Sequence, residues 1–341
     1  MARSTRSGAS AAATQEDWAR IGVSCPDFVE QVLQKGEENY RDLPWRNVDD
    51  PYAVLVSEVM LQQTQVARVE TRWAEWLDAF PSVFALAEAG TAEVLAAWQG
   101  MGYNRRALAL KAAAEEIVRG YDGVFPAGTK ELIALPGIGP ATAQGIRSFA
   151  FDLPGVYLET NVRTVLLHHL FPDVPGVPDR ELVPLAEATC PAAPASCGAE
   201  ADCFAGQKPG ALMAADARSA DPFAMPQDPD DTPRTWYYAM LDYGAYLKKT
   251  VPNPSRRAKA YTRQSRFEGS RRQKRAEIVR QLLDAQARGE RASTASLHAA
   301  LNDVERTAGR PPVEGELVES ILTDLAREGF CRECEGAWVI V

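Results

Sequence analysis

Apolar residues recur at helical spacing along almost all of residues 17–250, and the alternation typical of strands is nearly absent. Asp27 is expected to cap the first helix, and Pro51 suits the first turn of a helix over residues 52–63. Further helices are expected at residues 67–80, 91–98, 105–121, 130–135 and 235–247. The pattern therefore predicts a mainly α fold.

The end of the chain changes pattern. Helices are expected at residues 273–287, 294–301 and 314–328, followed by a short strand pair at 330–333 and 338–341. Helices followed by a small hairpin are typical of a winged helix. The sequence therefore predicts a small winged-helix-like domain over residues 272–341.

Two segments lack such periodicity. Residues 1–16 have no apolar stretch and are expected to form a disordered tail, and residues 190–233 are rich in Ala, Pro, Asp and Gly, as in a loop insertion. The all-helical domain is then expected to cover 17–247, with a six-helix lobe at about 51–144 inserted in a lobe formed by 17–50 and 145–247. Residues 248–271 would form a basic linker.

Composition limits the class of protein. An apolar content of 46% allows a large core, and no apolar run reaches the roughly 18 residues of a membrane span. Six Cys in 341 residues are too few for a disulfide scaffold, so reduced thiols are expected. We expect a cytoplasmic, nucleoid-associated monomer without a membrane partner.

The charge is unevenly distributed. Residues 248–280 hold twelve Lys and Arg against only Glu268 and Glu277, a net charge of +10. Because the whole chain carries −9, the other 308 residues sum to −19. Such a block favours a polyanion partner, although an ordinary basic surface or tail would have the same composition.

The string Leu135-Pro136-Gly137-Ile138-Gly139-Pro140-Ala141-Thr142-Ala143 lies between two predicted helices. Its glycines permit a tight turn that exposes backbone N–H groups at the start of the next helix, where a phosphate can bind. A plain helix–helix turn is the alternative. The full string resembles the helix-hairpin-helix of the DNA glycosylase superfamily that includes adenine DNA glycosylase and endonuclease III.

A second set of strings narrows the resemblance. Leu43-Pro44-Trp45-Arg46, then Ser57-Glu58-Val59-Met60-Leu61-Gln62-Gln63-Thr64-Gln65-Val66, then Gly100-Met101-Gly102-Tyr103 follow in the order seen in the adenine DNA glycosylase family. The resemblance covers about residues 27–170 and 234–248. It implies an enzyme of base-excision repair that removes adenine mispaired with 8-oxoguanine or guanine, with double-stranded DNA as its partner.

Breaking an N-glycosidic bond needs an acid for the leaving base and a carboxylate for the cationic sugar. The resemblance makes Glu58 the acid, and burial in its apolar helix would raise the pKa of the carboxyl group. The matching second carboxylate is Glu159, where the family has Asp, so the charge is kept on a longer side chain. A helix-capping carboxylate is the alternative reading of Glu159, and a surface or capped carboxylate is that of Glu58.

The resemblance also assigns binding roles. Residues expected at the base pocket or beside the opposite base are Trp45, Arg46, Gln62, Gln63, Thr64, Met101, Tyr103 and Asn161. Residues expected to bind DNA phosphates are Gly137, Gly139, Thr142, Arg256, Arg257 and Lys259. Packing in the core is the alternative for Met101 and Tyr103.

Two departures from the superfamily affect the chemistry. Ala141 stands where bifunctional endonuclease III has its nucleophilic Lys, so a monofunctional enzyme is expected. The four Cys positions of the family's iron–sulfur site fall on Lys248, Ser255, Ala258 and Gln264, so no cofactor and no metal are expected.

The remaining Cys and the C-terminus leave alternatives open. Cys190, Cys197 and Cys203 lack a fourth neighbouring ligand and are read as incidental thiols rather than a metal site. Residues 272–341 are too short for the domain with which the family reads 8-oxoguanine. A superfamily glycosylase for another base, an endonuclease III-like enzyme and a non-catalytic DNA-binding regulator are the alternative functions.

Overall fold

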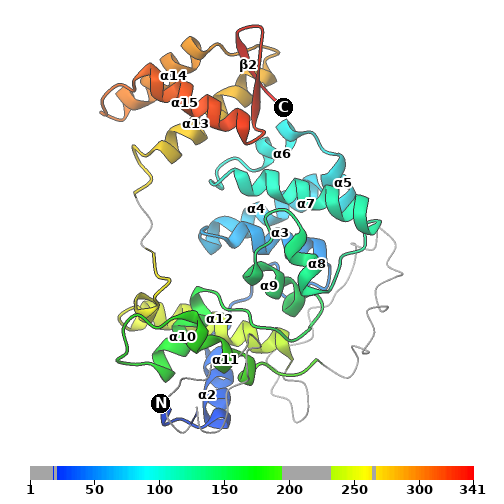
Figure 1. The fold of residues 1–341 in the computed structure, drawn as a ribbon, viewed down its shortest axis with the longest axis vertical. Coiled ribbons are helices and arrows are strands. Elements are labelled where there is room, and N and C mark those ends of the chain that lie inside the picture. Colours follow the sequence, from blue (N-terminus) through cyan, green and yellow to red (C-terminus); the bar gives the residue numbers. More distant parts are fainter. Residues whose placement is uncertain (1–17, 19–20, 194–231, 263–265) are drawn as a thin grey trace, which may run out of the picture. The chain divides into compact units, whose positions relative to one another are not determined.

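The computed structural model describes residues 18, 21–193, 232–262 and 266–341 (Figure 1). The predicted tail at 1–16 and nearly all of the predicted insertion at 190–233 lie outside these residues. Within the described part of the chain, no helix is both long and apolar enough to cross a membrane. The mainly α fold predicted from the sequence is confirmed, with one two-stranded sheet among the described residues.

The chain divides into two compact units. Unit 1 contains residues 1–58, 126–134 and 138–262, and unit 2 contains residues 59–125, 135–137 and 263–341. The boundary falls within helix α3 (Pro51–Leu61), between Glu58 and Val59. The predicted division into lobes and linker stays a prediction.

Unit 1 is built around a long central helix. Its complete helices are α2 (Cys25–Glu38), α8 (Thr129–Ala134), α9 (Pro140–Ala150), α10 (Thr160–Leu170), α11 (Asp179–Thr189), α12 (Pro233–Thr250) and the 3-10 helix η2 (Pro254–Arg257). Helix α12 packs against α2, α9 and α10. Its buried face carries Trp236, Tyr237, Met240 and Leu247, and this apolar face holds the unit together.

The start of α2 differs from the sequence-based prediction. Helix α2 begins at Cys25, and Ser24 is its N-cap because the Ser24 hydroxyl accepts the N–H of Asp27 at 3.2 Å. Asp27 therefore lies in the first turn, where its charge favours the helix dipole, and it is not the cap.

Unit 2 combines a helical group with the C-terminal helices. The first group comprises α4 (Val66–Ala79), α5 (Val83–Glu88), α6 (Thr91–Ala97) and α7 (Arg105–Tyr121). Helix α7 packs against α5 and α6, and Trp76 and Trp98 meet edge to face in the buried interior. These helices carry the loops at 62–65 and 100–104 that become important below.

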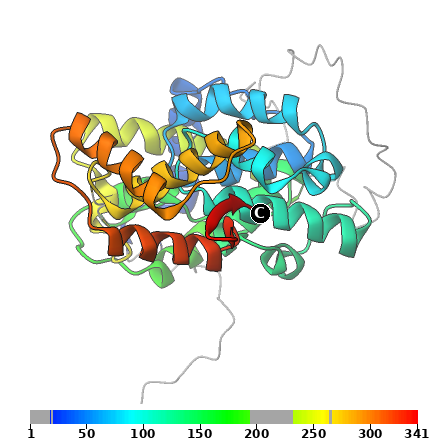
Figure 2. The same cartoon turned by 90° about the horizontal axis from the view of Figure 1, so that it is seen from above.

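The C-terminal part consists of α13 (Arg271–Ala287), α14 (Thr294–Thr307), α15 (Gly315–Arg327), β1 (Cys331–Cys334) and β2 (Ala337–Ile340). The three helices and the antiparallel hairpin pack together, orange to red in Figures 1 and 2. Ala292 adds a bridge to Trp338 of β2. Three helices followed by a hairpin are the order that the sequence predicted for a winged-helix-like domain.

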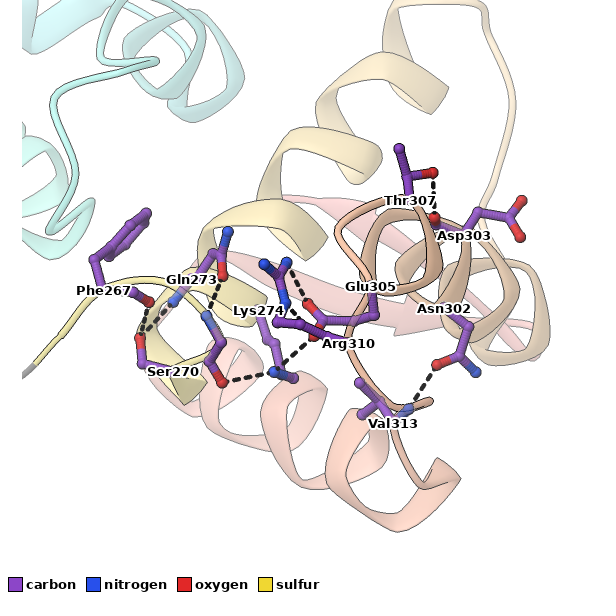
Figure 3. Close-up of polar contacts among 11 residues, drawn as sticks. Phe267, Ser270, Gln273, Lys274, Asn302, Asp303, Glu305, Thr307, Arg310 and Val313 are labelled. Atoms are coloured by element: carbon purple, nitrogen blue, oxygen red, sulfur yellow. Dashed lines mark hydrogen bonds and ion pairs between the residues drawn. The ribbon is translucent and has the colours of Figure 1, made fainter.

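A buried charge cluster links α13 to α14 (Figure 3). Glu305, only 2% exposed, accepts from Arg310 Nε at 2.7 Å and from Arg310 Nη2 at 3.0 Å. Lys274 donates to the same carboxylate at 3.4 Å and to the carbonyl of Gly269 at 2.7 Å. The cluster thus pairs buried charges and ties together the start of α13, the end of α14 and the loop that follows it.

Candidate active site

Helix α3 brings one ionisable side chain into an apolar setting. Its sequence is PYAVLVSEVML, and Asp50 begins it by accepting the N–H of Tyr52 at 2.9 Å. The hydroxyl of Ser57 donates a hydrogen bond to the carbonyl of Val54 at 2.9 Å. Glu58 is the one carboxylic acid of this helix and is 9% exposed.

The Glu58 carboxyl group has two close neighbours in unit 1. The hydroxyl of Tyr157 donates to Glu58 Oε1 at 3.4 Å. Gly145 of α9 faces the other oxygen, since a Cβ atom at position 145 would lie 2.1 Å from Glu58 Oε2. The missing side chain at Gly145 is therefore what leaves room for the carboxyl group.

Burial changes the ionisation of Glu58. Desolvation, with a further contribution from the charge of Glu159, raises the pKa of Glu58 to about 8, although the hydrogen bond from Tyr157 lowers it. A carboxyl group with this pKa is mostly protonated at neutral pH. It can therefore act as a proton donor where an exposed Glu could not.

Glu159 lies at the start of α10, where it is the N-cap. Its carboxylate accepts the N–H groups of Asn161 and of Val162, the latter at 3.0 Å. Burial raises the pKa of Glu159, while the charge of Lys248 and the backbone N–H groups oppose that rise. The capping role, which the sequence left as an alternative, is therefore present. The catalytic role stays a prediction that capping does not exclude.

Asn161, next to Glu159, was predicted to contact a base. Its Oδ1 atom is buried and has no hydrogen-bond partner among the described residues. Gly244 of α12 packs directly against the backbone of Asn161, since a Cβ atom at position 244 would lie 2.3 Å from the Asn161 carbonyl oxygen. Burying an unpaired amide oxygen is costly, so a missing donor is expected at this point.

The hairpin between α8 and α9 has the geometry that its glycines predict. Gly137 has φ +75°, a conformation that side chains disfavour, and a Cβ atom there would approach that of Ala109 to 2.6 Å. Gly139 is the N-cap of α9 and has no side chain to cover the first-turn N–H groups. Thr142 is largely buried in the first turn of α9, and its predicted phosphate contact stays a prediction.

Arg46 has a clear structural role. Its two terminal nitrogens donate to Asp242 of α12 at 2.6 and 2.7 Å, and its guanidinium stacks on Tyr40 and Tyr238. Trp45 is buried beside it in the sequence. The fold alone explains both residues, and their predicted contacts with a flipped base stay predictions.

In unit 2, Arg106 holds together the two loops that carry several of the residues predicted to lie near the opposite base. It donates to the carbonyls of Val59 and Met60 at 2.9 and 3.0 Å, and to the carbonyl of Gly102 at 2.9 Å. It also donates to the hydroxyl of Thr64 at 3.1 Å and to the carbonyl oxygens of Gln62 and Met101. One guanidinium thus joins the loop after α3 to the loop before α7.

Those loops differ in exposure. Gln63 is exposed and has a left-handed φ of +56°, and Tyr103 is half-buried with φ +50°. Met101 is buried, so the alternative of core packing applies to it. An exposed amide in a strained, well-anchored loop is compatible with a contact beside the opposite base, which stays a prediction for Gln63.

The described cations of the basic stretch differ in what they contact within each unit. Arg256 and Lys259 are exposed in unit 1, whereas Arg257 donates to the carbonyl of Leu167 at 2.8 Å. Residues 257–259 are held by a backbone bridge in which Val177 bonds to Arg257 and Lys259 at 2.9 Å each. In unit 2, most cations pair with carboxylates, and these are Arg266, Arg271, Lys274, Arg275 and Arg280.

The residues at the family's iron–sulfur positions do not suit a cluster. Lys248 carries an amine, Ser255 is bonded to Asn253, and Ala258 pairs its backbone with Val177. Gln264, Cys197 and Cys203 lie outside the described residues. Among the described residues, no group of three or more His, Cys, Asp or Glu could hold a metal ion.

The fold and the site define a helical domain with a helix-hairpin-helix turn and a buried protonated carboxyl group. Residues 56–217 match the family model described as "HhH-GPD superfamily base excision DNA repair protein". This part of the chain is therefore similar to that superfamily.

Curated relatives are also found. The chain is 46% identical over 137 residues to the adenine DNA glycosylase of Mycolicibacterium smegmatis, covering 40% of this chain and 47% of the relative. It is 43% identical over 131 residues to that of Mycobacterium tuberculosis H37Rv, covering 38% and 43%. The chain thus matches less than half the length of these relatives. A solved thermostable thymine-DNA glycosylase aligns with a TM-score of 0.44 and 24% identity, over 51% of this chain and 80% of that one.

Three residues of the candidate site and its loops were not found from the sequence. They are Tyr157, Gly145 and Arg106. Tyr157 lies two residues before Glu159, the only sequence hint of its position. Gly145 is a glycine inside a helix, which signals close packing without naming the partner. The contacts of Arg106 are with residues distant in sequence or with backbone carbonyls, which leave no pattern.

Proposed function

We propose that this protein is a DNA glycosylase of base-excision repair that removes adenine mispaired with 8-oxoguanine or guanine. The observation that carries the proposal is the buried Glu58, whose pKa of about 8 keeps it protonated at neutral pH. Glu58 lies in the segment that the superfamily model matches, and the curated relatives named above are adenine DNA glycosylases.

The chemistry follows from the two carboxyl groups. As the N-glycosidic bond breaks, negative charge develops on the leaving purine, and Glu58 would protonate it. Positive charge develops on the sugar, and the Glu159 carboxylate would stabilise it or activate a water molecule. Burial raises the pKa of Glu159, whereas Lys248 and the N–H groups at the start of α10 oppose that rise and favour the ionised form that this role requires.

The donor Tyr157 fits the same reaction. Its hydroxyl group stays protonated because burial and the nearby carboxylates raise its pKa well above the ordinary value. The Tyr157 backbone N–H is in turn bonded to the hydroxyl of Tyr237 at 3.0 Å. Tyr157 is thus a positioning residue that orients the Glu58 carboxyl group.

Double-stranded DNA is the proposed partner. The first-turn N–H groups of α9, at Gly139 and beyond, would bind a phosphate at the positive end of the helix dipole. The exposed Arg256 and Lys259 would add charge contacts in unit 1. The unpaired Asn161 Oδ1 would accept a hydrogen bond from the flipped nucleotide.

We propose that the reaction needs no iron–sulfur cluster and no lysine nucleophile. The amine, hydroxyl and methyl groups at Lys248, Ser255 and Ala258 cannot replace cysteine thiolates. Ala141 offers no amine for a Schiff base. Base removal would therefore leave an intact strand at the abasic site.

The deciding experiment uses a panel of duplexes with adenine opposite 8-oxoguanine, guanine or thymine, and with other damaged bases. Each is incubated with the full chain and then treated with alkali. Adenine release opposite 8-oxoguanine or guanine, with strand breaks only after alkali, is the expected result. Release of a base other than adenine would show that the proposed substrate is wrong. Strand breaks before alkali would contradict the monofunctional assignment.

Glu58→Gln removes the proton donor but keeps the shape, so it should bind the duplex and lose excision by about 100-fold or more. Glu37→Gln on the exposed face of α2 is the matched control and should behave as the wild type. Substantial excision by Glu58→Gln would rule out its role as the acid.

A further inference from the structure

Arg272 of α13 reaches the loop that precedes α7, within unit 2. Its Nη1 atom donates to the hydroxyl of Tyr103. Its guanidinium also lies over the Tyr103 ring at 4.9 Å from the centroid, and over the Phe267 ring at 5.3 Å. One side chain of the C-terminal helices therefore contacts both the edge and the face of Tyr103.

The backbone of Tyr103 is fixed separately. Tyr103 follows Gly102, and both have positive φ angles, +50° and +69°. Arg106 binds the carbonyl of Gly102 at 2.9 Å and lies 5.5 Å from the centroid of the Tyr103 ring. Arg106 thus sets where the loop lies, whereas Arg272 sets the direction of the Tyr103 side chain.

An open cavity of about 300 Å³ lies at this point, and its lining includes Gln63, Tyr103, Phe267, Arg272 and Arg275. Aromatic rings beside guanidinium groups suit a planar nucleobase, since both stack on its face. Phe267 is 41% exposed. Helix α13 and the segment before it thus bring cations and an aromatic ring to a cavity that the exposed Gln63 also lines.

Neighbouring arginines on α13 have other partners. Arg271 pairs with Asp324 at 2.6 Å, and Arg275 pairs with Glu328 at 2.7 Å, which fastens α13 to α15 and the residue after it. Arg272 lies between them in sequence and is directed to Tyr103. Only an arginine can donate from its edge while stacking with both faces, which a lysine ammonium cannot do.

We propose that Arg272 is a positioning and specificity-determining residue that holds the Tyr103 ring for reading the base opposite the excised one. The inference rests on the proposed function. It assigns the C-terminal helices, which lie beyond the segment matched by the superfamily model, a part in discriminating between base pairs.

The test compares Arg272→Met and Arg272→Lys with Arg271→Met. The control variant removes the same charge from the same helical turn and leaves Tyr103 untouched. Single-turnover excision is measured for adenine opposite 8-oxoguanine, guanine and thymine. Arg272→Met should reduce the preference for the best opposite base about tenfold, a typical coupling between contacting residues. Arg272→Lys should fall between, and Arg271→Met should keep the wild-type preference.

Tyr103→Phe completes the cycle, because it removes only the hydroxyl that Arg272 binds. If Arg272 acts through Tyr103, the double variant should lose little more preference than Arg272→Met alone. Additive losses would show that Arg272 does not act through Tyr103. An unchanged preference in Arg272→Met would also overturn the proposal. Faster excision by Arg272→Met would overturn it as well, because the contact with Tyr103 would then slow the reaction.

Duplex binding provides a readout without base release. The same variants are measured in the Glu58→Gln background against duplexes that differ only in the opposite base. If the protein without any substitution binds these duplexes with different affinities but releases no base from them, the proposed function is contradicted. The inference about Arg272 would then still require Arg272→Met to reduce the difference in affinity. Loss of the distinction in Arg272→Met but not in Arg271→Met supports the inference. Equal effects of both variants on binding and thermal unfolding would reduce Arg272 to a structural role.

Discussion

At the scale of the residue, the chemistry of this chain depends on how Glu58 is enclosed. Gly145 leaves the space, Tyr157 donates to the carboxyl group, and burial raises its pKa to about 8. Only Glu58 was identified from the sequence, because its motif names it. Its neighbours come from α9 and from the segment before α10, and no local pattern could place them there.

The pH dependence of excision should follow Glu58. Because the protonated form is the donor, the single-turnover rate should fall as the pH rises through about 8. Tyr157→Phe removes the hydrogen bond that lowers this pKa, so the fall should move to higher pH, by up to about one unit. A rate profile that is flat from pH 7 to pH 9 in the wild type would contradict this assignment.

Gly145→Ala tests the space beside the carboxyl group. The new methyl group would lie 2.1 Å from Glu58 Oε2 and 2.9 Å from the Tyr157 ring, so the acid must move. A displacement of about 1 Å costs on the order of 100-fold in rate. Gly90→Ala, where the same methyl group meets open space, is the control for excision measured under single-turnover conditions. Equal activity of both variants would show that the carboxyl group tolerates displacement.

At the scale of the element, helix positions were predictable and their ends less so. The prediction for residues 105–121 agrees with α7 at both ends, and α14 extends six residues beyond the predicted 294–301. Caps decide such boundaries, as Ser24 does for α2, and they depend on side-chain contacts that apolar spacing does not encode. The ion pairs between α13 and the other C-terminal helices could likewise not be predicted from the sequence.

Glu305→Gln should destabilise the C-terminal helices. It leaves Lys274 buried without its charged partner, and breaking a buried pair costs about 3 kcal/mol in the free energy of unfolding. Glu290→Gln, at an exposed pair with Arg288, should cost less than about 1 kcal/mol in the same urea titration. Similar losses for the two variants would contradict a structural role for the cluster in Figure 3.

The same cluster has a pH signature. Hydrogen bonds from Arg310, together with the charge of Lys274, lower the pKa of Glu305 below its ordinary value of 4.5. A lowered folded pKa means that the stabilisation is complete above pH 4.5 and is lost as the pH falls through the lowered pKa. Acid unfolding of the wild type should therefore be steeper below pH 4.5 than that of Glu305→Gln.

At the scale of the whole molecule, the net charge is a poor guide to DNA binding. The sequence located an excess of +10 in residues 248–280 but could not show that most cations after 265 are paired with carboxylates. Such pairing is set by residues such as Asp324 and Glu328, which lie about 50 positions further along the chain. The cations that remain exposed in unit 1 include Arg256 and Lys259.

Salt dependence should distinguish these two groups. Arg256→Ala and Lys259→Ala should each weaken duplex binding and lower the slope of log affinity against log salt by about 1. Arg280→Ala should change the slope little, because Arg280 is bound to Asp284 at 2.7 Å and to Glu277. Fluorescence titrations from 50 to 200 mM salt would measure all three, and a large effect of Arg280→Ala would show that its pairs open on DNA.

The enclosed Glu58 also has a cost for folding. In the unfolded chain this carboxyl group would ionise near 4.5, and in the folded protein it ionises near 8, so folding takes up a proton between these values. Native stability must therefore decline as the pH rises across that range. Keeping this acid therefore makes the folded protein less stable in alkaline conditions, where its carboxyl group is ionised. A Glu58→Gln variant should be more stable there but inactive.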